Sequence, residues 1–185
     1  MLNSEKAKSL CLKIHSNAKY IIGGKELPYY EHCFMVAKII QDNVKEPVNM
    51  DYCLTLAYLH DSVEDTEITP EYLKENFGED VASGVLALSK DKSIAYENQI
   101  ADSVKRIKLL GKSEVAIVKM ADRTCNISEI LDFWSDEKYA RYLKEAKFIK
   151  DELGIFSPSM AKRLENQIEA CRKNLKAKRN LTVEI

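Results

Sequence analysis

The sequence predicts an all-α fold, a single compact helical bundle, and three observations lead to this prediction. Glycine and proline are scarce, with six and four copies, and they fall between pieces of helical length. Within those pieces, apolar residues recur at helical spacing. No stretch shows the turn-bounded alternation of apolar and polar residues that is typical of strands. A chain of 185 residues can build one sizeable core but not two full domains. We therefore expect one domain over residues 1–178 and a loose tail over residues 179–185.

The first predicted helices follow the glycine pair Gly23-Gly24 and the prolines Pro28 and Pro47. Each carries apolar residues three and four positions apart, which places them on one helical face. The apolar residues of the first segment are Phe34, Ala37, Ile39 and Ile40. In the second segment, Leu54, Ala57 and Tyr58 share one face with Asp61. Both segments therefore read as helices with one buried face.

The next helix has recognisable start and stop signals. Thr69 suits an N-cap, Pro70 suits the first helical position, and Glu71 complements the helix dipole. Phe77-Gly78 then ends the segment. The sequence thus indicates both ends of a short helix.

Four further segments complete the bundle. Residues 103–110 form an amphipathic pattern, with apolar side chains on one face and basic ones on the other. The run 115–118 is wholly apolar, which fits either a buried strand or a buried helix. The polar Lys119 and the continuation to Asp122 favour a helix. Residues 138–153 and 159–178 read as two closing helices.

Composition excludes several classes of protein. The net charge is −1, so there is no global positive field to attract nucleic acid. No apolar run approaches the roughly 20 residues needed to cross a bilayer, and the N-terminal residues lack a signal-peptide core. The five cysteines stand singly, which predicts buried, reduced thiols. We expect a cytoplasmic protein that binds neither nucleic acid nor membranes, and its oligomeric state stays open.

The doublet His60-Asp61 is the strongest chemical signal. At the end of an apolar helix it offers an imidazole nitrogen and a carboxylate to one cation, a mixed set that suits Mn²⁺, Fe²⁺ or Mg²⁺. Glu64 and Asp65 follow one turn later, where one carboxylate can act as a base and the other can orient a water molecule. Considered alone, these two acids would be read as a solvated acidic face.

Two further segments add to this pattern. His32 precedes a helical stripe, and Asp122 interrupts an apolar stretch, where an uncompensated charge is costly. A metal, Arg123 or another base could compensate Asp122. Considered alone, His32 is more often a core or surface histidine, and Asp122 is more often a buried salt-bridge partner. Asn126 lies four residues after Asp122, on the same face. Because packing alone would favour apolar residues at each position, the conjunction predicts a metal site.

The order of these residues resembles the HD superfamily, and within it the hydrolase domain of the RelA/SpoT enzymes. Pro28-Tyr29-Tyr30-Glu31-His32 resembles the family segment PYxxH, and residues 60–66 resemble HDxVEDT. Phe77-Gly78 with Val81 resembles FGxxV, and residues 118–126 resemble VKLADRxxN. The resemblance covers about residues 15 to 150. It implies a bundle of the HD type and a stand-alone small alarmone hydrolase.

The resemblance also implies roles for individual residues. His32, His60, Asp61 and Asp122 become ligands of a divalent metal, usually Mn²⁺ in that family. Glu64 and Asp65 become the pair that activates water, and Asn126 a contact to the nucleotide. The implied reaction removes the 3′-pyrophosphate from guanosine tetra- and pentaphosphate, (p)ppGpp, giving GDP or GTP and pyrophosphate.

The substrate contacts depart from the family pattern. The family carries an Arg-Lys pair before PYxxH, whereas this chain offers Lys19, Lys25 and the aromatic ring of Tyr20. Lys90 and Arg123 are the other bases placed to bind phosphate. The missing arginine motivates an alternative substrate, another nucleotide or a phosphorylated dinucleotide. A third hypothesis, from another class, is a non-catalytic HD module that binds a nucleotide.

Overall fold

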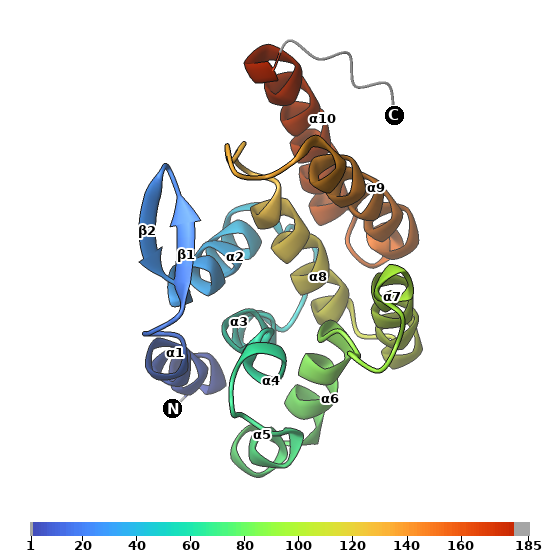
Figure 1. Ribbon diagram of the computed structural model, residues 1–185. Coiled ribbons are helices and arrows are strands. Elements are labelled where there is room, and N and C mark those ends of the chain that lie inside the picture. The colour runs from blue at the N-terminus through green and yellow to red at the C-terminus, as the bar shows by residue number, and fades with distance from the viewer. Residues whose placement is uncertain (1, 180–185) are drawn as a thin grey trace.

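The computed structural model describes residues 2–179, and helices dominate this range (Figure 1). Its elements, in chain order, are α1 (Asn3–Ile14), β1 (Lys19–Ile22), β2 (Lys25–Pro28), α2 (Tyr30–Asn43), α3 (Met50–Leu59), α4 (Ser62–Asp65), α5 (Pro70–Phe77), α6 (Glu79–Leu88), η1 (Tyr96–Asn98), α7 (Gln99–Leu110), α8 (Ser113–Asn126), α9 (Asp136–Leu153), η2 (Gly154–Phe156) and α10 (Pro158–Arg179). The all-α prediction is confirmed, apart from one small hairpin.

Helix α8 is the centre of the arrangement. It contacts α2, α3, α6, α7, α9 and α10, and Figure 1 shows it running between the N-terminal helices and the closing pair. Every residue from Val115 to Ala121 is buried. A helix buried on all sides needs no polar face, which explains why its sequence lacked a clear amphipathic pattern. The apolar run 115–118 is therefore a buried helix, as predicted.

The hairpin β1–β2 is the element that the sequence analysis missed. Its strands pair antiparallel, with Ile22 opposite Lys25, so Gly23 and Gly24 form the two-residue turn. Both glycines have positive φ, 59° and 69°, as the favoured two-residue hairpin turn requires. Each strand has only four residues, and only β1 alternates between exposed and half-buried side chains, so the pattern was too short to indicate a strand.

The predicted ends of α5 agree with the structure, whereas the helix expected over residues 103–110 begins earlier, at Gln99. Thr69 caps α5 by accepting a hydrogen bond from the Tyr72 amide at 3.2 Å, and Gly78 ends it with a φ of 91°. The two closing helices are α9 and α10. Arg179, the first residue of the predicted tail, is the last residue of α10, and residues 180–185 lie outside the described residues.

The core joins side chains from both halves of the chain, from Ala7 on α1 to Leu175 on α10. All five cysteines are buried and free, as predicted. Between residues 2 and 179, no helix combines the length and the apolar character needed to cross a membrane.

Candidate metal centre and its pocket

Four side chains from distant segments meet beside α8. His32 is the third residue of α2, His60 follows the end of α3, Asp61 precedes α4, and Asp122 lies on α8. His32 Nε2 lies 3.2 Å from Asp122 Oδ1 and 3.7 Å from Asp61 Oδ2. His60 Nε2 lies 2.9 Å from Asp61 Oδ2 and 3.7 Å from Asp122 Oδ1. Two imidazoles and two carboxylates thus surround one point.

The hydrogen bonds of His60 prepare it for a metal. Its Nδ1 lies 2.9 Å from the Ala57 carbonyl, which only accepts, so Nδ1 carries the proton and Nε2 presents a lone pair. Nε2 is buried and has no hydrogen-bond partner of suitable geometry, even though Asp61 Oδ2 is close. Ligand atoms of His32, His60 and Asp122 lie within 4.8 Å of one another. These residues fit a divalent metal.

Outer contacts orient the other three side chains. His32 Nδ1 lies 3.5 Å from Cys125 Sγ. The Tyr29 hydroxyl donates to Asp61 Oδ2 at 2.6 Å, and the Asn126 amide donates to Asp122 Oδ1 at 2.6 Å. Such partners fix the direction of ligands before a metal binds.

The electrostatics of the cluster favour added positive charge. Burial lowers the pKa of His32, but hydrogen bonds to Asp122 and Cys125 outweigh it and raise the value to about 10. Burial raises the pKa of Asp122, yet the hydrogen bond from His32 and the nearby imidazole of His60 hold it well below its usual range. The pKa of Asp61 is also lowered, chiefly by His60 acting against burial. Both carboxylates therefore stay ionised, which is the state in which they can bind a divalent cation.

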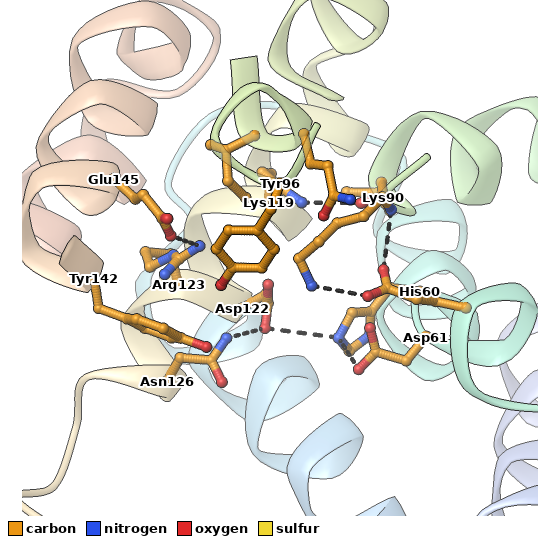
Figure 2. A pocket seen from close by; sticks show the side chains of 14 residues that line it. His60, Asp61, Lys90, Tyr96, Lys119, Asp122, Arg123, Asn126, Tyr142 and Glu145 are labelled. Atoms are coloured by element: carbon orange, nitrogen blue, oxygen red, sulfur yellow. Dashed lines mark hydrogen bonds and ion pairs between the residues drawn. The ribbon is translucent and has the colours of Figure 1, made fainter. Parts of the chain in front are cut away.

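A pocket opens beside the cluster, and about 620 Å³ of empty space, part of it open solvent, lies within it (Figure 2). The 14 side chains around it include His60, Asp61 and Asp122 of the cluster. The others are Glu64, Leu88, Lys90, Tyr96, Gln99, Ile100, Lys119, Arg123, Asn126, Tyr142 and Glu145. Three basic groups beside a metal cluster suit an anionic ligand, and two tyrosine rings offer apolar surface.

The two predicted catalytic acids differ in position. Glu64 lines the pocket, where its Oε1 pairs with Lys90 Nζ at 2.8 Å and its Oε2 accepts from the Lys90 amide at 3.0 Å. Asp65 is absent from the pocket lining. Burial, Asp61 and Glu64 together raise the pKa of Asp65. The geometry therefore brings Glu64 to the ligand space, and the assignment of Asp65 stays a prediction.

The predicted substrate contacts separate into two groups. Lys90, Arg123 and Asn126 line the pocket. Arg123 does not compensate Asp122, because its guanidinium pairs with Glu145 at 2.9 Å.

The hairpin residues form the second group, away from this pocket. Lys19 pairs with Glu26 at 3.0 Å, both of them exposed, and Lys25 is exposed as well. The ring of Tyr20 packs against His32, with centroids 5.2 Å apart, and its hydroxyl lies 3.8 Å from Cys125 Sγ. These contacts place Tyr20 behind a candidate ligand, while the substrate roles of Lys19, Tyr20 and Lys25 stay predictions.

Five polar or aromatic residues of the pocket were not singled out as site residues from the sequence: Tyr96, Gln99, Lys119, Tyr142 and Glu145. Lys119 gave a signal, since a lysine inside a run of buried residues needs a reason to be there. Tyr96, Tyr142 and Glu145 stand on segments that look like ordinary surface helices or loops, so no local pattern indicates them.

The fold and the cluster together define a class, the α-helical domains that bind a divalent metal between paired histidines and aspartates. The chain belongs to the HD domain family, whose model matches residues 9–166. It is similar to the guanosine-3′,5′-bis(diphosphate) 3′-pyrophosphohydrolase of Aquifex aeolicus (strain VF5), with 31% identity over 134 residues. That match covers 71% of this chain and 18% of the relative, so the chain spans about a fifth of that relative's length.

Two other comparisons involve proteins of similar size. The guanosine-3′,5′-bis(diphosphate) 3′-pyrophosphohydrolase MESH1 of Drosophila melanogaster is 28% identical over 137 residues, which cover 70% of this chain and 73% of the relative. A solved structure described as "A metazoan ortholog of SpoT hydrolyzes ppGpp and plays a role in starvation responses" matches with a TM-score of 0.78. At 21% identity, over 92% of this chain and 96% of that one, it supports the fold.

Proposed function

We propose that this protein is a metal-dependent phosphohydrolase that removes the 3′-pyrophosphate from (p)ppGpp, giving GDP or GTP and pyrophosphate. The observation that carries the proposal is the convergence of His32, His60, Asp61 and Asp122 beside a pocket that is also lined by Lys90, Lys119 and Arg123. The names of the Aquifex and Drosophila relatives support the choice of substrate. A nucleotide partner and a cytoplasmic location belong to the same proposal.

A divalent cation, with Mn²⁺ as our choice, would be held by the four clustered side chains and would supply Lewis acidity to the phosphate and to water. Glu64 is the base that we assign, because its carboxylate lines the pocket and pairs with Lys90. Lys90 orients that carboxylate through two hydrogen bonds. Asn126 keeps Asp122 in place. Attack by water on the phosphorus breaks its bond to the 3′ oxygen, which leaves with the electron pair.

The test incubates the purified protein with Mn²⁺ and guanosine tetraphosphate and measures released pyrophosphate and GDP. His60→Ala and Asp61→Ala should abolish turnover. Asp42→Ala serves as the control, because Asp42 is exposed on α2 and pairs only with Lys38 in the described residues. Absence of pyrophosphate release by the metal-loaded wild type would refute the proposal.

A second candidate substrate is another nucleotide or a phosphorylated dinucleotide. It is favoured by the hairpin, which bears no arginine and whose Lys19 is paired with Glu26. A panel of nucleotides with Mn²⁺ distinguishes the two, since release of phosphate rather than pyrophosphate would indicate a monophosphate ester. A non-catalytic nucleotide-binding module would bind members of the panel and turn over none.

A further inference from the structure

Lys119 is a buried cation in the pocket wall. It lies on α8, one turn before Asp122, so both side chains lie on one side of that helix. Only 5% of Lys119 is exposed, yet the residue lines the same pocket as His60, Asp61 and Asp122. Figure 2 shows it behind Tyr96, on the side of the pocket where Lys90 lies.

The partners of Lys119 leave most of its hydrogen-bonding capacity unused. Its Nζ donates to the Leu88 carbonyl at 2.9 Å, and an ammonium group has three donors. Over residues 2–179, Lys119 forms no ion pair with a carboxylate. The other two bases of the pocket each pair with a carboxylate, Lys90 with Glu64 and Arg123 with Glu145, although Arg123 Nε and Nη1 have no hydrogen-bond partner. A buried charge without a counter-ion is costly unless a ligand supplies one.

A purely structural role would be to cap α6, since Leu88 is the last residue of that helix. A cation near a helix C-terminus is favourable. However, the Leu88 carbonyl also lies 3.4 Å from the Ser103 hydroxyl, and that hydroxyl bonds the Ala87 carbonyl at 2.7 Å. Capping therefore has a second, neutral donor, and it does not require a buried ammonium that faces a pocket.

We propose that Lys119 is an oxyanion-binding residue, which holds the second phosphate of a pyrophosphate group whose first phosphate lies at the metal cluster. The assignment rests on the proposed function for the identity of the substrate and extends it to a pyrophosphate subsite. Lys119 is suited to this position because no carboxylate within residues 2–179 forms an ion pair with it. Burial lowers the pKa of Lys119 to about 8, so part of the Lys119 population carries a neutral amine near pH 8. A bound phosphate would favour the charged ammonium form.

The test uses inorganic pyrophosphate as the probe and calorimetric titration of the Mn²⁺-loaded protein as the readout, so no turnover is needed. Lys119→Met should weaken pyrophosphate binding roughly 10- to 100-fold, the value of a lost charge-assisted hydrogen bond. Lys119→Gln keeps a donor for the Leu88 carbonyl but removes the charge, and it should weaken binding in the same way with less loss of stability. Lys105→Met is the matched control, because Lys105 is exposed on the neighbouring helix α7.

A second readout compares two nucleotides. With a 3′-pyrophosphate substrate, Lys119→Gln should raise KM or lower kcat/KM, whereas affinity for the corresponding 3′-monophosphate should change little. If the Gln variant folds and binds pyrophosphate like the wild type, Lys119 is a helix cap and the inference is wrong. Failure of the wild type to bind pyrophosphate would overturn the inference as well. Binding that depends on Lys119 without turnover of guanosine tetraphosphate would instead refute the proposed reaction and leave the subsite standing.

Discussion

The hydroxyl of Tyr29 offers a sharp test of how the metal cluster is organised. Tyr29 Oη donates to Asp61 Oδ2 at 2.6 Å, and that same oxygen faces both His32 and His60. Burial raises the pKa of Tyr29, and Asp61 raises it further, so the phenol stays protonated and remains a donor. Tyr29→Phe removes this one hydroxyl and keeps the ring that packs on His32, with centroids 5.3 Å apart.

The magnitude follows from the charge and burial of the acceptor. A hydrogen bond to a charged group contributes about 1.5–3 kcal/mol. Asp61 retains 17% side-chain exposure, so water replaces part of the lost bond, and we expect about 1–2 kcal/mol. This converts to metal binding weakened roughly 5- to 30-fold. Changes in the partners of metal ligands have similar effects, typically about 10- to 100-fold.

The assay is a calorimetric titration of the metal-free protein with Mn²⁺ at constant pH and ionic strength. Tyr20→Phe is the control, because it also removes a phenol whose ring packs on His32. Its hydroxyl lies 3.8 Å from Cys125 Sγ, a weak contact with no carboxylate. The control should bind metal within about twofold of the wild type.

Equal metal affinity in the Tyr29→Phe variant and the wild type would refute the reasoning, because the bond could then not orient Asp61 for a cation. An equal loss in both phenylalanine variants would also contradict it. In that case the tyrosines would act through packing on His32 rather than through the hydrogen bond.

Three other predictions concern metal, an ion pair and pH. Chelation of divalent metal should lower Tm by roughly 5–10 °C relative to protein held at about 100 times the metal Kd, and calorimetry should find no such shift in His60→Ala. Arg123→Met should lower the free energy of unfolding in urea by about 2–4 kcal/mol, because the half-buried Glu145 carboxylate loses its near partner. The control Arg141→Met removes an exposed and more distant partner of Glu145 and should lower it by less than about 1 kcal/mol. Burial lowers the pKa of His15 below 6.5, so the unfolded chain binds a proton there that the folded protein does not, and stability should fall as pH drops below about 6.5. The loss between about pH 7 and 5 should be smaller in His15→Phe, and identical pH profiles would contradict this assignment.

The helices were predictable because their signals are local. The N-cap Thr69 and the stop at Gly78 act on the residues beside them, so the sequence located α5 without knowledge of its neighbours. The hairpin was not predicted, because strands of four residues have too few side chains to show a periodic pattern. Gly23-Gly24 nevertheless lies at its turn.

The cluster was predictable for a different reason. His32, His60, Asp61 and Asp122 are costly in apolar surroundings, so their positions next to buried segments already required a shared compensation. The structure brings these four together, and their role as ligands stays the prediction that the metal titrations test.

The helical class, both ends of α5 and the residues that meet at the cluster could be read from the sequence alone, because periodicity, capping and the cost of buried charge are properties of short segments. Which base of the pocket lacks a carboxylate partner, by contrast, follows only from the packing of the helices. Arg123, the base nearest to Asp122 in sequence, pairs with Glu145 of α9, while Lys119 lies in the pocket wall without a carboxylate partner among the described residues. Ion pairs form between groups that packing brings within a few ångströms, and this proximity depends on how α6, α8 and α9 pack, which no single segment encodes.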